Sequence, residues 1–115
     1  MKRIALAVAI AVGTQLALAQ QTVKIASLVE LSGPGTTSGT NFRNGIDLAV
    51  KEINAAGGIL GRKIVTETND TQSNPAVAKA LTVKAIDNDS YVVMGPVFSG
   101  SIIVSMAETK RAEIP

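Results

Sequence analysis

The sequence predicts an α/β fold in which a parallel sheet has helices on both faces. Short β-branched, apolar runs alternate along the chain with longer segments of helical periodicity. Glycine-rich loops stand where strands would pass into helices. Apolar residues make up 46% of the 115 residues and aromatic residues only 3%, which suits an Ala-, Val- and Ile-rich core. Such alternation predicts parallel strands, because each helix returns the chain to the same end of the sheet.

The N-terminal residues 1–19 have the features of a secretory signal peptide. Two basic residues follow the initiating Met, a run of nine apolar residues comes next, and Ala17 and Ala19 are the small residues that signal peptidase accepts. A membrane span needs about 20 apolar residues, and polar residues interrupt this run earlier. We therefore expect cleavage before Gln20 and an exported part comprising residues 20–115.

The predicted leader accounts for the basic character of the chain. The whole sequence has 11 basic and 9 acidic residues, and removal of the two leader charges leaves an exported part of zero net charge. This balance and the scarcity of aromatic residues argue against a nucleic-acid partner. The chain has no cysteine, so lipid attachment after the cleavage site is not possible. We expect a soluble exported protein with no lipid anchor and no disulfide.

The first half of the exported part predicts two strands with a helix between them. Residues 23–29 are apolar and β-branched, which predicts a buried strand. A loop over residues 31–39 follows, and apolar side chains then recur at spacings of four, three and four over residues 42–53. Glycines 57–58 end this helix by supplying a left-handed cap. Residues 63–69 predict the second strand.

The second half predicts a further helix, a strand and another helix. Ser73 or Asn74 caps the second helix, with proline in its first turn. Residues 91–94 predict a short third strand. A glycine- and serine-rich loop leads to a third helix near Ser101, which we interpret as an N-cap. Residues 114–115 have the character of the start of a fourth strand.

The two glycine-rich loops are where function is expected. If the strand order is second, first, third, residues 31–39 and 95–101 leave neighbouring strands at the same edge of the sheet. Ligands of open α/β sheets bind beyond the carboxyl ends of the strands, at the point where the strand order reverses. A binding site is therefore expected between these loops.

The loop over residues 31–39 does not have the spacing of a nucleotide-binding loop. A Walker loop requires G-x-x-x-x-G-K-[ST], whereas Gly33 and Gly39 are one residue too far apart and Thr40 stands at the lysine position. The dinucleotide fingerprint also fails, because the third glycine comes one residue late after Gly35. No acidic residue lies at the ribose-binding distance of about 20 residues. These departures disfavour a nucleotide.

Hydrolytic and metal chemistry are also disfavoured. The chain has no histidine and no cysteine, so it supplies neither a Ser–His pair, a cysteine nucleophile nor a typical zinc site. Asp87 and Asp89 fit a solvated turn better than a metal site. We expect no catalytic residue, no metal and no cofactor in this chain. The alternative function is that of a secreted enzyme on a similar sheet, whose catalytic residues lie outside this sequence.

The groups that remain for binding are hydroxyls and backbone amides. Ser99 lies in the second loop beside a helix start, where amide groups point outward and the helix dipole favours an anion. Such neutral donors suit a carboxylate. We favour ligand contact over a capping role for Ser99, and a capping role for Ser101.

These stretches resemble the start of the substrate-binding proteins of branched-chain amino-acid ABC transporters. These are leucine-binding-protein-like members of the type I periplasmic binding proteins. The similarity is carried by the motif "SGP" at residues 32–34, "INAAGGILGRK" at 53–63, "NDTQSNPAVAKA" at 69–80 and "GPVFSGS" at 95–101. It covers residues 22–115. It implies a Rossmann-like periplasmic-binding-protein lobe that is truncated within the first of two lobes.

The resemblance also implies a mechanism and a site. Two lobes close on an amino acid or a similar small carboxylate in the periplasm, and the closed form docks transiently on an ABC permease in the inner membrane. Ser99 matches the family's loop serine that contacts the ligand, with Phe98 and Gly100 beside it. Ser38 stands where several relatives have an aromatic ring, which leaves room for a bulkier, aromatic or more polar ligand. The resemblance implies no catalysis, and it is compatible with a ligand-sensing domain of the same fold.

Overall fold

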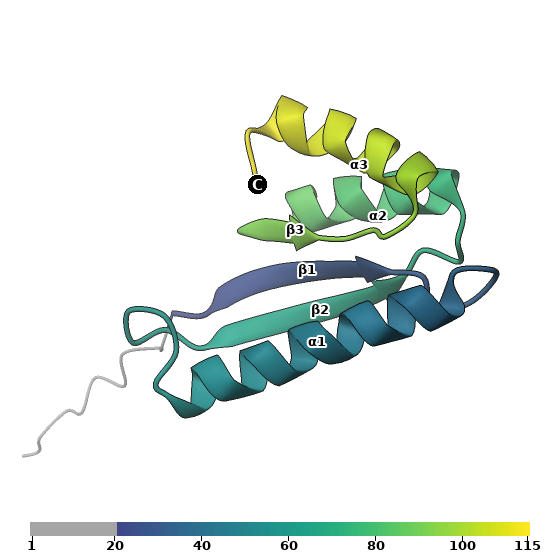
Figure 1. Ribbon diagram of the computed structural model, residues 1–115. Helices are drawn as coiled ribbons and strands as arrows, with labels where there is room; N and C mark the ends of the chain where they lie inside the picture. Colours follow the sequence, from purple (N-terminus) through teal and green to yellow (C-terminus); the bar gives the residue numbers. More distant parts are fainter. Residues whose placement is uncertain (1–20) are drawn as a thin grey trace, which may run out of the picture.

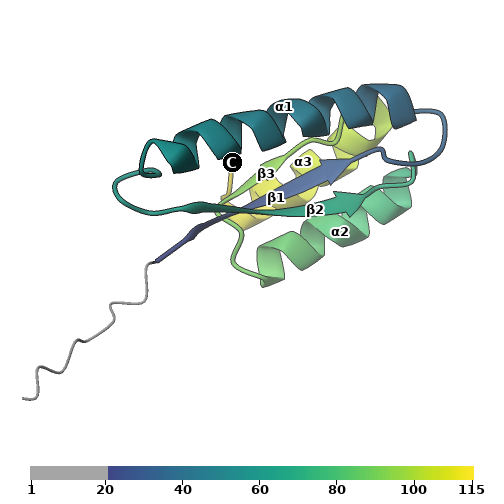
Figure 2. The same ribbon diagram turned by 90° about the horizontal axis from the view of Figure 1, so that it is seen from below.

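A three-stranded parallel sheet lies between helices in the computed structural model, which describes residues 21–115 (Figures 1 and 2). Helix α1 covers one face of the sheet, and helices α2 and α3 lie together on the other. The elements in chain order are β1 (Val23–Val29), α1 (Thr36–Ala55), β2 (Ile64–Asp70), α2 (Pro75–Asp87), β3 (Val92–Met94) and α3 (Ser99–Ala112). The predicted α/β class is confirmed. The predicted signal peptide, residues 1–19, and its cleavage site lie outside the described residues.

The strand order is β2–β1–β3, which is the order that the expected site between the two loops requires, and β1 runs parallel to both of its neighbours. Ile25 of β1 pairs with Thr66 on one side and with Val92 on the other. The central strand is the most deeply buried, and its Leu28 and Val29 have no exposed surface. A parallel strand covered on both faces needs such a continuous apolar run. The carboxyl ends of β1 and β3 therefore lie next to each other.

Helix α1 approaches the end of β1 very closely. A Cβ atom placed on Gly39 would lie 2.1 Å from the carbonyl oxygen of Glu30, and one placed on Gly35 would lie 2.7 Å from Glu30 Cβ. Any residue with a side chain would force the helix away from the strand. Farther along the same helix, Gly45 has no atom within 4 Å of the equivalent position. The tight contact is therefore confined to the end of α1 that lies beside the glycine-rich loop.

Two helices begin earlier than the sequence predicted. Helix α1 begins at Thr36, inside the predicted loop, and α3 begins at Ser99 rather than near Ser101. Their N-cap residues, Gly35 and Phe98, make no side-chain capping hydrogen bond, so the sequence contains no capping signal. The prediction that Ser101 is an N-cap is wrong, because this residue lies in the first turn of α3 and is completely buried.

Helix α2 begins as predicted. Asn74 is its N-cap, and the Asn74 Oδ1 atom accepts hydrogen bonds from the amides of Ala76 at 2.8 Å and Val77 at 3.4 Å. Pro75 occupies the first helical position, where its missing N–H group leaves no donor unsatisfied and its fixed φ suits the helix. Here the capping signal in the sequence is local, and it locates the helix correctly.

Buried polar side chains join α2 to α3. The hydroxyl of Thr82 donates to the carbonyl of Ala78 at 2.8 Å and lies 2.9 Å from Ser105 Oγ. Glu108 is also buried, and its carboxylate lies 3.4 Å from Lys79 Nζ and 2.9 Å from an Arg111 guanidinium nitrogen. This buried acid is therefore paired with two cations.

Among the strands of residues 21–115, β3 is the outer one on its side of the sheet. The N–H of Val93 donates to the carbonyl of Pro115 at 2.9 Å. The predicted fourth strand at residues 114–115 is not a strand in the described part of the chain, but this bond joins it to β3. Across residues 21–115, no helix has the length and apolar character needed to cross a membrane.

Candidate functional site

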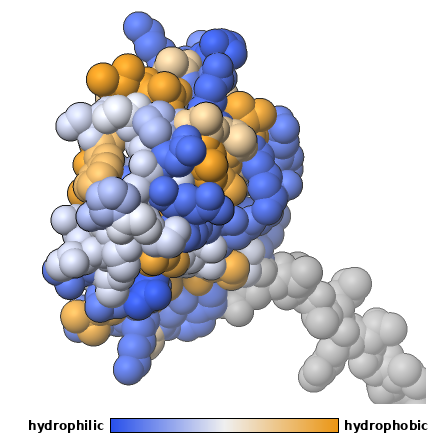
Figure 3. All heavy atoms as spheres, turned by 90° about the vertical axis from the view of Figure 1, so that its right-hand side faces the viewer, coloured by the Kyte–Doolittle hydropathy of each residue, from blue (hydrophilic) through white to orange (hydrophobic). Residues whose placement is uncertain are grey.

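The loops after β1 and β3 meet at the carboxyl edge of the sheet. The first turns of α1 and α3 lie at this same edge (Figures 1 and 2). The ring of Phe98 lies against the backbone of Gly35, since a Cβ atom there would be 3.0 Å from Phe98 Cζ. Figure 3 views the molecule from this end, where pale and hydrophilic atoms cover much of the face and hydrophobic atoms form separate patches. The predicted neighbourhood of the two loops is therefore present.

Asp70, the last residue of β2, holds the loop that follows β1. Its Oδ1 atom accepts hydrogen bonds from the amides of Leu31 at 2.8 Å and Ser32 at 3.2 Å. It also accepts one from the amide of Gln72 at 2.8 Å, and its Oδ2 atom accepts the Ser32 hydroxyl at 2.6 Å. Burial alone would raise the pKa of the Asp70 carboxyl, but the hydrogen bonds from Ser32, Gln72 and Leu31 together hold that pKa below its ordinary value. The ionised carboxylate thus fixes the course of the loop.

Ser73 holds the same loop at a second point. Its hydroxyl donates to the carbonyl of Ser32 at 2.7 Å and accepts from the amide of Gly35 at 3.0 Å. Ser73 has φ +53°, a left-handed conformation that is unusual for a residue other than glycine. The two bonds help to maintain it. Gly33 has φ +76° and packs directly against Ser73, so the residues after β2 enclose the glycine-rich loop.

Glu30 connects the end of β1 to the start of α3. Its side chain has no exposed surface. The amide of Val97 lies 3.2 Å from each of the two carboxylate oxygens, and the amide of Phe98 lies 3.2 Å from Oε1. Because these amides belong to the residues that lead into α3, the carboxylate fixes where that helix begins.

Ser99 lies at the start of α3 with its polar groups available. It is exposed, and its hydroxyl makes no hydrogen bond within residues 21–115. The amide of Ile102 bonds to the carbonyl of Phe98 at 2.8 Å, whereas the amides of Ser99 and Gly100 have no acceptor in the described chain. The first turn therefore presents one hydroxyl and two amide donors to an approaching acceptor.

The other predicted site residues lie at the same edge of the sheet. Phe98 is the N-cap of α3 and is 36% exposed. Gly100 is exposed. A Cβ atom placed on it would lie 3.5 Å from Pro75 Cγ, so one side of Gly100 lies against α2. Ser38 is an exposed residue of the first turn of α1. Three predicted residues are thus adjacent at one helix start, and the fourth lies at the other.

Sequence reasoning assigned no site role to Glu30 or Asp70, and it considered Ser73 only as a possible cap of the second helix. A signal for two of them was present, because each acid follows or ends an apolar or β-branched run. An acid at the carboxyl end of a parallel strand lies near the amide donors of the loops and helix starts found there. In the described residues, no group of three or more acidic side chains is placed to hold a metal ion.

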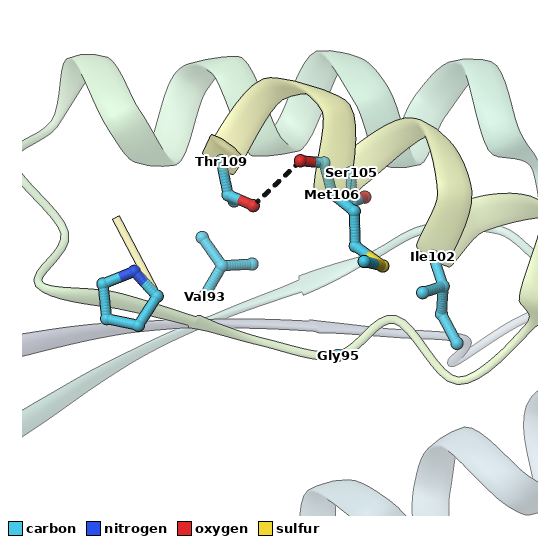
Figure 4. Close-up of a pocket in the computed structure, with 7 residues that line it drawn as sticks. Val93, Gly95, Ile102, Ser105, Met106 and Thr109 are labelled. Atoms are coloured by element: carbon cyan, nitrogen blue, oxygen red, sulfur yellow. Dashed lines mark hydrogen bonds between the residues drawn. The ribbon is translucent and has the colours of Figure 1, made fainter. Parts of the chain in front are cut away.

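Two cavities lie beside the sheet, and the first of them reaches Gly95 and Ile102 near this edge. One of about 150 Å³ lies between β3 and α3, where Ile102 and Met106 project from the helix toward Val93 and Gly95 (Figure 4). The other, of about 730 Å³, lies at the opposite edge of the sheet and is lined partly by Leu60. Neither is lined by a predicted site residue. Within residues 21–115 the candidate site is an exposed surface, not an enclosed pocket.

Comparisons with known proteins match almost all of the described chain. A family model described as periplasmic binding protein matches residues 22–115. The chemotactic signal transduction system substrate-binding protein BasB of Halobacterium salinarum is 38% identical over 97 residues, which cover 82% of this chain and 23% of that protein. The Leu/Ile/Val-binding protein BraC3 of Rhizobium johnstonii is 37% identical over 86 residues, which cover 75% of this chain and 23% of that protein.

A solved structure also resembles the chain. The branched-chain amino acid transporter substrate-binding protein LivJ of Streptococcus pneumoniae, in complex with isoleucine, has a TM-score of 0.80 and 36% identity. The similarity covers 83% of this chain and 28% of that one. The chain thus spans 23% of the length of the two curated relatives.

Proposed function

Because the chain belongs to the periplasmic binding protein family, we propose that the protein is the extracytoplasmic solute-binding component of an ABC importer. It binds an amino acid of the branched-chain type, or a similar small carboxylate, and delivers it to a permease in the inner membrane. It is exported as a soluble periplasmic protein, and it binds its ligand without changing it. The names of two relatives support the ligand class, since BraC3 is a Leu/Ile/Val-binding protein and LivJ was solved with isoleucine.

The observation that carries this proposal is the set of unused donors at the start of α3. A carboxylate placed there accepts hydrogen bonds from the Ser99 hydroxyl and from the amides of Ser99 and Gly100. Bonds between such donors and an ionised acceptor are shorter and stronger than those between neutral groups. The positive end of the helix dipole adds to the attraction.

The charges at this edge favour a ligand with a single carboxylate over a multiply charged anion. Residues 30–38, 70–76 and 95–101 contain the acids Glu30 and Asp70 and no lysine or arginine. A phosphate or a dicarboxylate therefore meets no cationic side chain from these segments. An amino acid offers a single carboxylate whose charge is balanced by its own ammonium group, which suits neutral donors.

A second candidate function is ligand sensing for chemotaxis. The relative BasB is named a chemotactic signal transduction substrate-binding protein, and it is 38% identical to this chain. Both functions use the same ligand site, and they differ in the membrane protein that the bound form contacts. Deletion of the gene distinguishes them: loss of radiolabelled leucine uptake supports transport, and loss of the swimming response alone supports sensing.

The ligand site is tested in a two-lobed protein. Residues 22–115 replace the matching segment of the pneumococcal LivJ protein, and leucine, isoleucine, valine, phenylalanine and benzoate are titrated by calorimetry. We expect one of these ligands to bind and to be recovered unchanged. A folded chimera that binds none of them would contradict the proposed ligand class, and a ligand converted to product would favour the enzyme alternative.

The substitution Ser99→Ala tests the contact itself. Loss of a hydrogen bond to a charged group costs about 1.5–3 kcal/mol, so affinity should fall by roughly 10- to 150-fold. Thr109→Ala is the matched control, because it removes a hydroxyl near the other end of α3 that bonds only to its own helix. Equal affinities for the Ser99→Ala and Thr109→Ala chimeras would refute the contact.

A further inference from the structure

Glu30 is a buried acid without a cationic partner. Its side chain has no exposed surface, and none of the salt bridges within residues 21–115 involves it. The other buried acid, Glu108, lies against Lys79 and Arg111. An uncompensated buried charge is strongly unfavourable, so the surroundings of Glu30 must supply another form of compensation.

Backbone amides supply that compensation. The N–H of Val97 is equidistant, at 3.2 Å, from the two carboxylate oxygens, and the N–H of Phe98 lies 3.2 Å from one of them. Phe98 is the N-cap of α3, so the carboxylate lies beside the positive end of the helix dipole. These contacts determine the position of the two residues that immediately precede Ser99.

The packing around Glu30 also connects it to the other loop of the site. Gly35, the N-cap of α1, lies against the Glu30 side chain, and Gly39 lies against its carbonyl. The ring of Phe98 lies against the same side of Gly35. The Glu30 side chain is thus enclosed by the end of β1, the start of α1 and the start of α3. A change in its size or hydrogen bonding displaces both helix starts.

We propose that Glu30 is a positioning residue for the candidate ligand site, which sets the start of α3 so that Ser99 and the free amides face the ligand. This inference rests on the proposed function, because Glu30 can affect ligand affinity only if the site binds a ligand. Glu30 does not touch the ligand, because its side chain is fully buried. Glutamine has nearly the same shape but replaces one acceptor oxygen with an NH₂ donor. That donor cannot accept the shared bond from Val97, so Glu30→Gln shifts the residues before Ser99.

The first test measures affinity in the two-lobed chimera. We expect Glu30→Gln to weaken ligand binding at least tenfold, and the matched control Glu108→Gln to leave affinity unchanged, because its carboxylate lies between α2 and α3. If Glu30 acts through Ser99, Glu30→Gln should weaken affinity less in a chimera that already carries Ser99→Ala. The effects of two coupled residues on the binding free energy are not additive. Full additivity, or wild-type affinity in a folded Glu30→Gln chimera, would overturn the proposal.

The second test needs no ligand, and its first measurement, on the unmodified chain, needs no variant. In the isotope-labelled chain of 115 residues, the amide protons of Val97 and Phe98 should be shifted downfield and protected from exchange by the carboxylate. A folded Glu30→Gln chain should lose both signatures at these two residues and retain them in α2. Exposed, unshifted amides at Val97 and Phe98 in the unmodified chain would overturn the positioning role. If the chimera binds no ligand while these signatures are present, the proposed function fails and the positional role of Glu30 stands.

Discussion

The two ends of the sheet differ in whether their side chains bond to other segments of the chain. At the carboxyl edge, the side chains of Glu30, Asp70 and Ser73 each bond to the backbone of another segment. At the amino edge, Leu60 is 97% exposed and Tyr91 is 70% exposed, beside a cavity of about 730 Å³. The candidate site is therefore ordered by contacts within residues 21–115, whereas the opposite end presents apolar surface without partners in the described chain.

The difference teaches which residue types order a site of this kind. The start of a helix leaves amide donors without intrahelical acceptors, and the carboxyl edge of a parallel sheet collects several helix starts. A carboxylate accepts several such donors at once, which an apolar side chain cannot do. Glu30 and Asp70 fill this role, so acids that contact no ligand shape a surface proposed to bind one.

The largest expected effect tests the tight packing at the carboxyl edge. Gly39→Ala places a Cβ atom 2.1 Å from the Glu30 carbonyl oxygen, so α1 must move and the free energy of unfolding should fall by about 3 kcal/mol. Gly45→Ala in the same helix meets no atom within 4 Å and should raise it by about 0.5–1 kcal/mol. Urea denaturation of both variants measures the contrast, and equal effects would show that the close approach at Gly39 does not restrain the helix.

A smaller effect is expected at Asp70, and it depends on pH. Asp70→Asn replaces one of the two acceptor oxygens with an NH₂ donor and removes the charge that strengthens the bonds from the Ser32 hydroxyl and neighbouring amides. It should lower the free energy of unfolding by about 1–2 kcal/mol at neutral pH. Because the folded-state pKa of Asp70 is lowered, its contribution is present above the unfolded-state pKa of about 4 and is lost as the pH falls through the folded-state pKa. The variant and the wild type should therefore converge in stability at acidic pH, as measured by urea denaturation across a pH series.

The control for Asp70 is an acid outside the site. Asp47 lies 3.8 Å from Arg43 on α1, where the Asp47 side chain is 55% exposed and the Arg43 side chain is 37% exposed. Asp47→Asn should change the free energy of unfolding by less than about 0.5 kcal/mol. An Asp70→Asn variant that behaves like Asp47→Asn would mean that the loop after β1 is held by Ser73 alone.

The smallest effect is expected at the amino edge. Leu60 is almost fully exposed and has φ +50°, a conformation that Asn adopts more readily than Leu. Leu60→Asn should therefore leave the free energy of unfolding within about 0.5 kcal/mol of the wild type. Thermal and urea denaturation measure this. A loss above 1 kcal/mol would show that Leu60 is packed, and the contrast between the two ends would no longer hold.

Sequence patterning located the regular elements well where their signals are local. The apolar run of β1 and the Asn74 cap of α2 each lie within a few neighbouring residues, and the alternation of strands and helices predicts that the strands run parallel. The starts of α1 and α3 were misplaced, because Gly35 and Phe98 cap these helices without a side-chain bond. A pattern-based method has no signal to use at such positions.

The candidate site was predicted only in its exposed part. A hydroxyl in a glycine-rich loop beside a helix start can be recognised in the sequence, and this led to Ser99. Ser38, Phe98 and Gly100 came only from the resemblance to the binding-protein family. The residues that order the loops could not be assigned, because their partners are backbone amides far away in the sequence. Glu30 bonds to an amide 68 residues later, and Asp70 to one 39 residues earlier. Every residue except proline carries such an amide, so the sequence does not indicate which one a buried acid will meet.

The parallel pairing of β1 has a consequence for the time course of synthesis. Ile25 pairs with Thr66 and Val92, so the partners of this strand are made 41 and 67 residues after it. At about 5–20 residues per second, β1 waits about 2–8 s for its first partner strand. Throughout that interval its apolar residues have no sheet to join, and such segments are prone to aggregate. Of the three described strands, the most buried is thus the one that stays unpaired longest in the nascent chain.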